Sequence, residues 1–156
     1  MALSTPPTGV RRLFFRFPIS LFRFGLGPLL GNRFLLLNHI GRRSGLPRQA
    51  VLEVIEAHRD QDIYLVASGW GPNSDWFQNL LKHPDVSIQV GRRRLPVTAE
   101  PLSPAESGKA LARYARKYPT AARNLPRLIG IPSDGSEESF RDIGERLMPC
   151  IRFRPR

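Results

Sequence analysis

The hydrophobic positions between residues 33 and 102 follow the pattern of short β-strands separated by tight turns. Val86, Ile88 and Val90 alternate with Ser87 and Gln89, which is the period of a strand with one buried face. Further apolar runs of strand length, each ended by turn-forming residues, cover 33–40, 49–58, 63–68 and 94–102, and a last short run covers 150–153. This pattern predicts antiparallel strands that close into a small barrel or a strongly curled sheet.

Helical signals fall between and after these strands. Residues 74–82 read as an inserted helix with Asn73 or Ser74 as its N-cap, and Ser103 to Glu106 form a capping box that opens a helix to about residue 117. Residues 136–147 are amphipathic and predict a helix. The pattern over 119–131 is ambiguous and is compatible with a second short helix. The predicted fold class is therefore α+β, with a barrel, one inserted helix and flanking helices.

The first 30 residues differ from the rest and are treated as a tail with an amphipathic helix, followed by a barrel domain over 31–156. Within 11–26, Arg12, Arg16, Ser20 and Arg23 line one narrow stripe and Pro18 is expected to kink the helix. Phenylalanine, leucine and isoleucine fill most of the other positions, so the helix either packs on the barrel or contacts a membrane surface peripherally.

The net charge of +11 comes almost entirely from arginine, since lysine occurs at only three positions. Residues 1–52 contain eight arginines and no acid. Such a balance suits an anionic ligand, a nucleic acid or an anionic membrane, although biased genomic base composition would produce it too. No recognition-helix or RNA-binding sheet motif accompanies the charge, so nucleic acid is the less favoured partner.

Cys150 is the single cysteine, so no internal disulfide can form and a cytoplasmic location is expected, with the inner face of the membrane as the alternative. The apolar segment near the N-terminus is interrupted by arginine well before the roughly 20 residues that a spanning helix needs. His39, His58 and His83 share no ligand spacing, and we expect no metal site.

The turn after the first strand carries the sharpest chemical signal. Gly41 and Gly45 bracket Arg42, Arg43 and Ser44, and Leu46, Pro47 and Arg48 follow. Glycine permits close approach of the backbone to a ligand, and guanidinium groups bind phosphate oxygens through paired donors. The alternative is a solvated hairpin turn. The lysine and following helix of a nucleotide-binding P-loop are missing.

A second segment leads from a strand through a glycine-rich loop into the inserted helix. It contains Ala67, Ser68, Gly69, Trp70 and Asn73, followed on the helix by Trp76 and Asn79. The free amides at a helix start suit an anion or a ring carbonyl, and a tryptophan can wall a flat ring. Trp76 as a core anchor is the competing interpretation.

Together the two segments resemble the deazaflavin-dependent nitroreductase family. The likeness covers about residues 34–120 and includes Gly-Arg-Arg-Ser-Gly-Leu-Pro-Arg, Val-Ala-Ser and Trp-Phe-Gln-Asn-Leu before His-Pro-Asp-Val. It implies a split β-barrel that binds coenzyme F420, a deazaflavin with a phosphodiester and a polyglutamate tail. By this match the phosphate and acidic tail contact Arg42, Arg43, Ser44, Gly45, Pro47 and Arg48, and the ring is bordered by Ala67, Ser68, Gly69, Trp70, Asn73, Trp76 and Asn79.

The resemblance also implies the reaction, which is hydride transfer between the deazaflavin and a small organic acceptor. The cofactor carries that chemistry, so no catalytic side chain is assigned. Tyr118 and Trp70 are the expected acceptor contacts. Ala121, Ala122 and Leu125 stand where nitroimidazole-reducing relatives have tyrosines, so a quinone-like acceptor is as well supported as a nitro compound.

Three alternatives remain open from the sequence. The same barrel could bind FMN, which has one phosphate and no acidic tail. The chain could instead be a non-enzymatic module for an anionic ligand or membrane surface. Barrels of this kind often pair through a sheet face, so a homodimer is a further expectation that no single residue establishes.

Overall fold

The computed structural model describes residues 33–156, apart from the side chains of residues 128 and 129. The helix expected over 11–26, and with it the membrane or barrel contact of that segment, lies outside the described residues. Within them, no helix is both long enough and apolar enough to cross a membrane.

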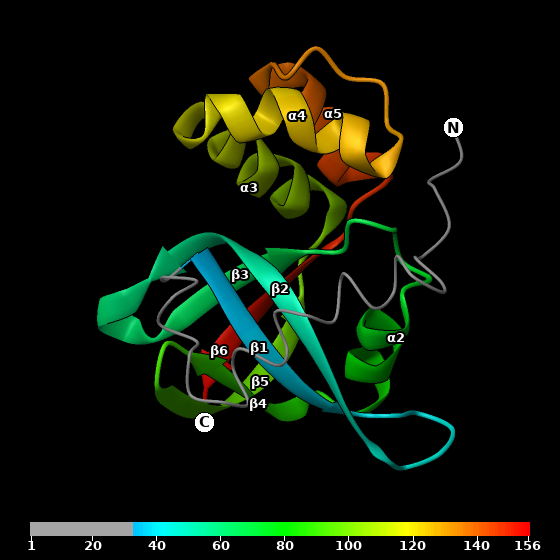
Figure 1. Ribbon diagram of the computed structural model, residues 1–156, viewed down its shortest axis with the longest axis vertical. Helices are drawn as coiled ribbons and strands as arrows, with labels where there is room; N and C mark the ends of the chain where they lie inside the picture. Colours follow the sequence, from blue (N-terminus) through cyan, green and yellow to red (C-terminus); the bar gives the residue numbers. More distant parts are fainter. Residues whose placement is uncertain (1–32) are drawn as a thin grey trace.

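Six antiparallel strands form a closed barrel in the order β1-β2-β3-β6-β5-β4 (Figure 1). Their bounds are Phe34–Ile40 (β1), Pro47–His58 (β2), Ile63–Ala67 (β3), Asp85–Val90 (β4), Arg93–Pro101 (β5) and Cys150–Pro155 (β6). Pairing of β1 with β4, for example Leu37 opposite Ile88, closes the ring of strands. The long strand β2 contains a register shift between Val54 and Glu56, which bends it to continue beside β3.

Alternate positions of the strands fill the barrel, as the period of two predicts. Large side chains with almost no exposure, such as Leu35, Leu37, Ile88 and Phe153, form this core. A second apolar cluster lies outside the barrel, between the strands and the helices, and is centred on Tyr114 and other buried residues including Leu65, Leu111, Phe140 and Ile143.

The inserted helix α2 (Asp75–Lys82) lies beside the barrel, whereas α3 (Pro104–Lys117), α4 (Pro119–Ile129) and α5 (Glu137–Arg146) form a layer at one end (Figure 1). Helices α3 and α5 pack with their backbones close together. A Cβ atom added at Gly144 would lie 2.6 Å from the carbonyl oxygen of Ser107, so only glycine fits there. The capping box is confirmed, because the Ser103 hydroxyl accepts the Glu106 amide hydrogen at 3.2 Å.

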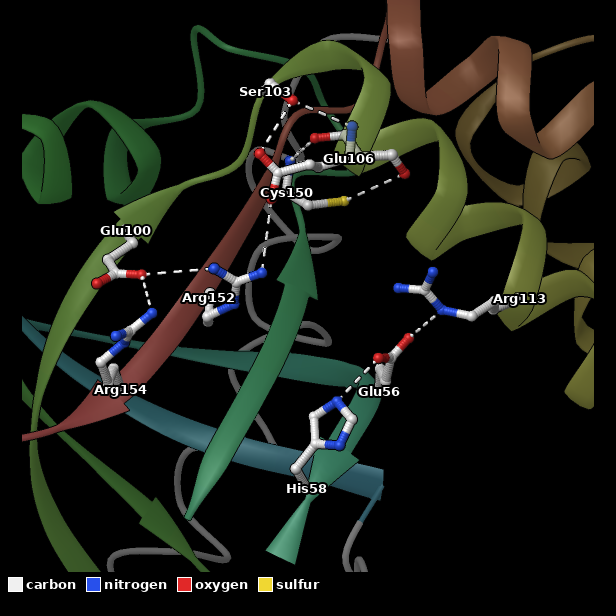
Figure 2. A network of polar contacts seen from close by, with 10 residues as sticks. Glu56, His58, Glu100, Ser103, Glu106, Arg113, Cys150, Arg152 and Arg154 are labelled. Atoms are coloured by element: carbon white, nitrogen blue, oxygen red, sulfur yellow. Dashed lines mark hydrogen bonds and ion pairs between the residues drawn. The ribbon is translucent and has the colours of Figure 1, made fainter. Parts of the chain in front are cut away.

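Polar contacts tie α3 to the strands (Figure 2). Arg113 of α3 pairs with Glu56 of β2 at 2.7 Å, and the buried Ser107 hydroxyl accepts the amide hydrogen of Cys150 at the start of β6. Burial raises the pKa of the Cys150 thiol to about 12, so this side chain is a packed, protonated thiol. These contacts fix where the helical layer sits on the barrel.

The predicted α+β fold class is confirmed, including the strand order along the chain and the inserted helix. The segment that the sequence left open, 119–131, is helix α4. Proline begins this helix and a second proline, Pro126, lies inside it, which obscures the helical pattern in the sequence. Gly130 ends it in the left-handed conformation, with φ of 79°.

Candidate cofactor and acceptor site

The turn between β1 and β2 is closed by its own backbone. The Gly41 amide donates to the Leu46 carbonyl, and the Gly45 amide donates to the Gly41 carbonyl, both at 2.9 Å. Gly45 has φ of 70°, a conformation that favours glycine, and a Cβ at Gly41 would lie 2.6 Å from the Ser44 hydroxyl. The backbone conformation of the turn thus favours glycine at position 45, whereas a side chain at position 41 would have to displace the Ser44 hydroxyl.

Arg42 differs from the other arginines of the turn because its side chain points toward α2. Its guanidinium lies 3.2 Å from the Asp75 carboxylate and 3.0 Å from the Asn79 amide oxygen. Its backbone amide donates to the same Asn79 oxygen, and Lys82 donates to its carbonyl. The sequence around Arg42 contains no acid, and the carboxylate beside it comes from a helix 33 residues later in the sequence.

Arg43 and Arg48 have no acid beside them. Both side chains are exposed, as are Ser44, Gly45 and Pro47. Among residues 33–156, neither guanidinium makes a hydrogen bond or an ion pair. The Ser44 hydroxyl accepts the Leu46 amide hydrogen at 3.2 Å and still has its own hydrogen to donate. The turn thus presents two uncommitted cations and one hydroxyl donor on a rigid backbone.

A buried amide and imidazole lie beneath this turn. Asn79 is 4% exposed and its Nδ2 lies 3.1 Å from Nδ1 of His39, which is 5% exposed. Burial, aided by the positive charge of Arg48, lowers the His39 pKa from 6.5 to about 4, so the ring is neutral at pH 7. Because the Asn79 oxygen already faces the donors of Arg42, its NH2 group faces His39, which places the imidazole proton on Nε2.

The loop from β3 to α2 is organised by Ser68. This residue is fully buried, and its hydroxyl contacts the Gly71 carbonyl and lies 2.8 Å from the Ser74 hydroxyl. Ser74 is the N-cap residue of α2 but caps it without a side-chain hydrogen bond. A Cβ at Gly69 would meet nothing within 4 Å, and Asn73 is exposed. Ser68 therefore shapes the loop, while Gly69 and Asn73 face open space.

The two tryptophans pack against different parts of the molecule. Trp76, on α2, is partly buried against the barrel core and makes an edge contact with Phe77, with ring centroids 6.0 Å apart. Trp70, in the loop, packs against the second cluster between the strands and the helices, to which the half-buried Ala67 also belongs. The interpretation of Trp76 as a core anchor is thus supported in part, because the residue packs against the core but is only partly buried.

Tyr118 lies where α3 ends and α4 begins. Its ring is 5.3 Å from the ring of Tyr114, and the Arg33 guanidinium lies 4.7 Å above it. Arg33 also pairs with Glu53 of β2 at 3.0 Å, and the Tyr114 hydroxyl donates to the same Glu53 oxygen at 3.0 Å. The residue just before β1, a residue within β2 and residues of the helical layer thus meet here.

A pocket of about 540 Å³ opens beside this group. Its walls are provided by β2, α3 and α4, through Glu53, Tyr114, Ala121, Asn124, Leu125 and Arg127. Ala121 and Leu125 are positions where the resemblance places the tyrosines of nitroimidazole-reducing relatives. Pockets of this size hold flat organic molecules of one to three rings.

Residues 25–127 match the F420H(2)-dependent quinone reductases. The chain belongs to this family. Two Mycobacterium tuberculosis relatives support the assignment. An F420H(2)-dependent quinone reductase is 41% identical over 93 residues, covering 58% of this chain and 57% of the relative. A putative F420H(2)-dependent quinone reductase is 33% identical over 122 residues, covering 78% and 89%. The match to the first relative thus spans little more than half of that protein.

Solved structures agree on the fold of this quinone reductase family member. An F420-H2-dependent reductase is 22% identical, with a TM-score of 0.52, over 78% of this chain and 93% of that one. A Clostridium acetobutylicum protein of the pyridoxinephosphate oxidase family has a TM-score of 0.53 at 10% identity, covering 90% and 84%. Both structures therefore share the fold of this chain, and the family match over residues 25–127 confirms the resemblance inferred from the sequence.

Several residues that shape the site of this family member escaped the sequence analysis. Arg33, Glu53 and Tyr114 are not among the site residues that the sequence predicted. Alternation along β2 placed Glu53 on the outward face, which was a usable signal, but its partners come from β1 and α3. Only the closed barrel brings the three together.

Proposed function

We propose that this chain is an F420-dependent oxidoreductase that transfers a hydride between the deazaflavin and a quinone. The observation that carries the proposal is the rigid turn and the adjoining start of β2, where the guanidiniums of Arg43 and Arg48 lack acidic partners among residues 33–156, in a member of the F420H(2)-dependent quinone reductase family. The family name of the relatives supplies the cofactor and the acceptor class.

The residues of the turn fit an anionic cofactor tail. Uncommitted guanidiniums near a phosphodiester or a polyglutamate carboxylate form charge-assisted hydrogen bonds, which are roughly twice as strong as neutral ones. We assign Arg43, Ser44 and Arg48 to these anionic groups, with the backbone at Gly45 and Pro47 beside them. Arg42 is assigned mainly to holding the turn against α2, since Asp75 and Asn79 already occupy its donors.

The ring-binding region follows from the β3–α2 loop and helix. Gly69 and Asn73 offer polar groups in open space, while Ala67 and the exposed parts of Trp70 and Trp76 offer apolar surface. Ser68 acts by shaping the loop, because its hydroxyl is buried and already engaged. Asn79 acts in the same indirect way, from beneath the turn.

The cofactor, when bound, supplies a hydride, and the overall reaction converts reduced F420 and a quinone into oxidised F420 and a hydroquinone. Two electrons and two protons pass to the quinone, so no other reductant is needed. The chain supplies orientation and exclusion of water. We assign the pocket between β2, α3 and α4 to the acceptor, with Tyr118 at its edge.

FMN is the second candidate, since a related barrel could bind it through the same turn. One terminal phosphate requires fewer guanidiniums than a phosphodiester with a glutamate tail, and the family name points to F420H2. F420 is therefore the primary assignment.

The deciding experiment is a titration of purified protein with reduced and oxidised F420, followed by cofactor fluorescence, with FMN titrated in parallel. We expect saturable F420 binding with a micromolar or tighter Kd and at least tenfold weaker FMN binding. Reduced F420 should then be oxidised in the presence of menadione, monitored by the return of deazaflavin absorbance. Absence of saturable F420 binding, or tighter binding of FMN, would contradict the proposal.

We further propose that the protein forms a homodimer. One solved chain with a similar fold, at 21% identity and a TM-score of 0.52, is described as a domain-swapped dimer. Light scattering at several protein concentrations tests this, and a monomeric mass throughout the micromolar range would contradict it.

A further inference from the structure

The pocket assigned to the acceptor has both apolar and polar residues in its walls, among them Asn124 and Arg127. Ala121 and Leu125 present apolar surface, as expected for a site that holds a flat ring. Glu53, an acidic residue whose side chain is 24% exposed, also lines the pocket. A negatively charged group in an apolar pocket affects which ligands fit, because it must keep hydrogen-bond partners when water leaves.

The two oxygens of this carboxylate are used differently. Oε1 accepts from both the Tyr114 hydroxyl and the Arg33 guanidinium, each at 3.0 Å. Oε2 accepts no hydrogen bond from any residue between 33 and 156. An ionised carboxylate has about four lone-pair positions, so Oε2 can accept hydrogen bonds from a ligand.

The partners of Oε1 hold the carboxylate in place. Burial, with the neighbouring negative charge of Glu53, raises the pKa of Tyr114, so its hydroxyl stays protonated and keeps donating. Arg33 is fixed in turn by its position above the Tyr118 ring, 4.7 Å from the centroid. Glu53 therefore presents Oε2 in a restrained direction instead of rotating freely.

We propose that Glu53 selects acceptors that have a hydrogen-bond donor, such as a hydroxyl or an N–H group, beside the quinone ring, by accepting that hydrogen at Oε2. This inference rests on the proposed function only in naming the occupant of the pocket as the acceptor. A ligand whose edge has only carbonyl oxygens or alkyl groups would displace the water that hydrogen-bonds to the carboxylate without offering a donor in its place. Such a ligand is expected to bind more weakly. Glu53 thus acts as a specificity-determining residue for the acceptor.

The test compares two quinones of nearly equal size, 2-(hydroxymethyl)-1,4-naphthoquinone and 2-ethyl-1,4-naphthoquinone. Both are neutral, and they differ by one hydroxyl in place of a methyl group. Their Kd values are measured by isothermal titration calorimetry on the full chain without F420. We expect wild-type protein to bind the hydroxymethyl compound about tenfold more tightly, as a hydrogen bond to a charged group predicts.

Glu53→Gln is the informative variant. The glutamine oxygen can still accept from Tyr114 and Arg33, while its NH2 group replaces Oε2 as a donor toward the pocket. We expect the preference for the hydroxymethyl compound to fall to twofold or less, with the Kd of the ethyl compound improved or unchanged. Glu56→Gln is the matched control, since Glu56 lies on the same strand but pairs with Arg113 outside the pocket walls, and it should keep the tenfold ratio.

Equal affinity of the wild-type protein for both quinones, or an unchanged ratio in Glu53→Gln, overturns the inference. Failure of both quinones to bind below millimolar concentration overturns it as well. Because these titrations contain no cofactor, their outcome is separate from the F420 titration. F420 binding with no quinone discrimination would leave the proposed function intact and remove only the role of Glu53.

Discussion

The arginines of β6 and those of the β1–β2 turn have the same chemistry and opposite surroundings. Arg152 lies 3.6 Å from Glu100 and 3.6 Å from Glu106, and Arg154 lies 3.1 Å from Glu100 (Figure 2). Arg43 and Arg48, in contrast, have no acid within reach among the described residues. The difference separates arginines that connect elements of the fold from arginines that are available to a ligand.

The two groups of arginines therefore differ in what they contribute to stability and to binding. Exposed ion pairs contribute from about 0 to 1 kcal/mol each to the free energy of unfolding, so the β6 pairs orient their strands more than they stabilise them. Unpaired cations on a rigid turn repel one another slightly, and they recover that free energy when an anion binds. The net charge of +11 alone does not reveal which arginines belong to which group.

The largest effect is expected from the double substitution Arg43→Ala with Arg48→Ala. Two charge-assisted hydrogen-bond donors are lost, each worth about 1.5–3 kcal/mol, so the Kd for F420 should rise by about 200-fold or more. The free energy of unfolding should change by less than about 0.5 kcal/mol, because neither guanidinium has a hydrogen-bond or ion-pair partner among residues 33–156. Fluorescence titration and urea unfolding measure the two quantities. A large loss of stability with unchanged affinity for F420 would show that these two arginines support the fold and do not bind the cofactor.

His39 is expected to produce the largest effect of pH on stability in this region. Its pKa is about 4 in the folded protein and 6.5 in the reference state, so the unfolded chain takes up its proton first as the pH falls. Above pH 6.5 the ring is neutral in both states, and His39 does not lower the free energy of unfolding. As the pH falls from 6.5 toward 4, the free energy of unfolding decreases by up to about 3 kcal/mol.

Urea unfolding of wild type and His39→Gln at pH 7 and pH 4.5 measures this contribution. Glutamine can accept from Asn79 but does not titrate, so the variant should lose distinctly less stability between the two pH values. Parallel pH profiles for the two proteins would contradict the neutral, buried imidazole.

Asn79→Ala tests the connection between the turn and helix α2. The substitution leaves the buried His39 nitrogen and the Arg42 amide hydrogen without a partner, at a cost of about 2 kcal/mol in the free energy of unfolding. Affinity for F420 should fall by about tenfold, because the turn is no longer held in place. Thermal unfolding and cofactor titration of the same sample measure both. Reduced affinity with wild-type stability would indicate that Asn79 contacts the cofactor directly instead.

The smallest effect is expected on the β6 face. Arg152→Ala and Arg154→Ala should each lower the free energy of unfolding by no more than about 1 kcal/mol, and each should leave the Kd for F420 within twofold of wild type. These variants are also the control for loss of positive charge, since the double variant Arg152→Ala with Arg154→Ala removes as much as the turn double variant does. If it weakens F420 binding equally, the general charge, and not the turn, attracts the cofactor.

The amino-acid sequence by itself determined the local features of this protein. Alternation of apolar residues located the strands, Ser103 and Glu106 marked the start of α3, and Gly41 and Gly45 located the turn that presents arginine. Each of these signals acts over a few residues, through backbone conformation, capping or side-chain period, and can be read without knowing the partners.

Only the tertiary structure decided which charged groups are paired. Asp75 reaches Arg42 across 33 residues, and Tyr114 reaches Glu53 across 61. These pairings depend on the register of strands and the position at which the helices pack, and no local pattern contains that information. The closed barrel therefore separates the arginines that hold the fold together from those left to bind an anion.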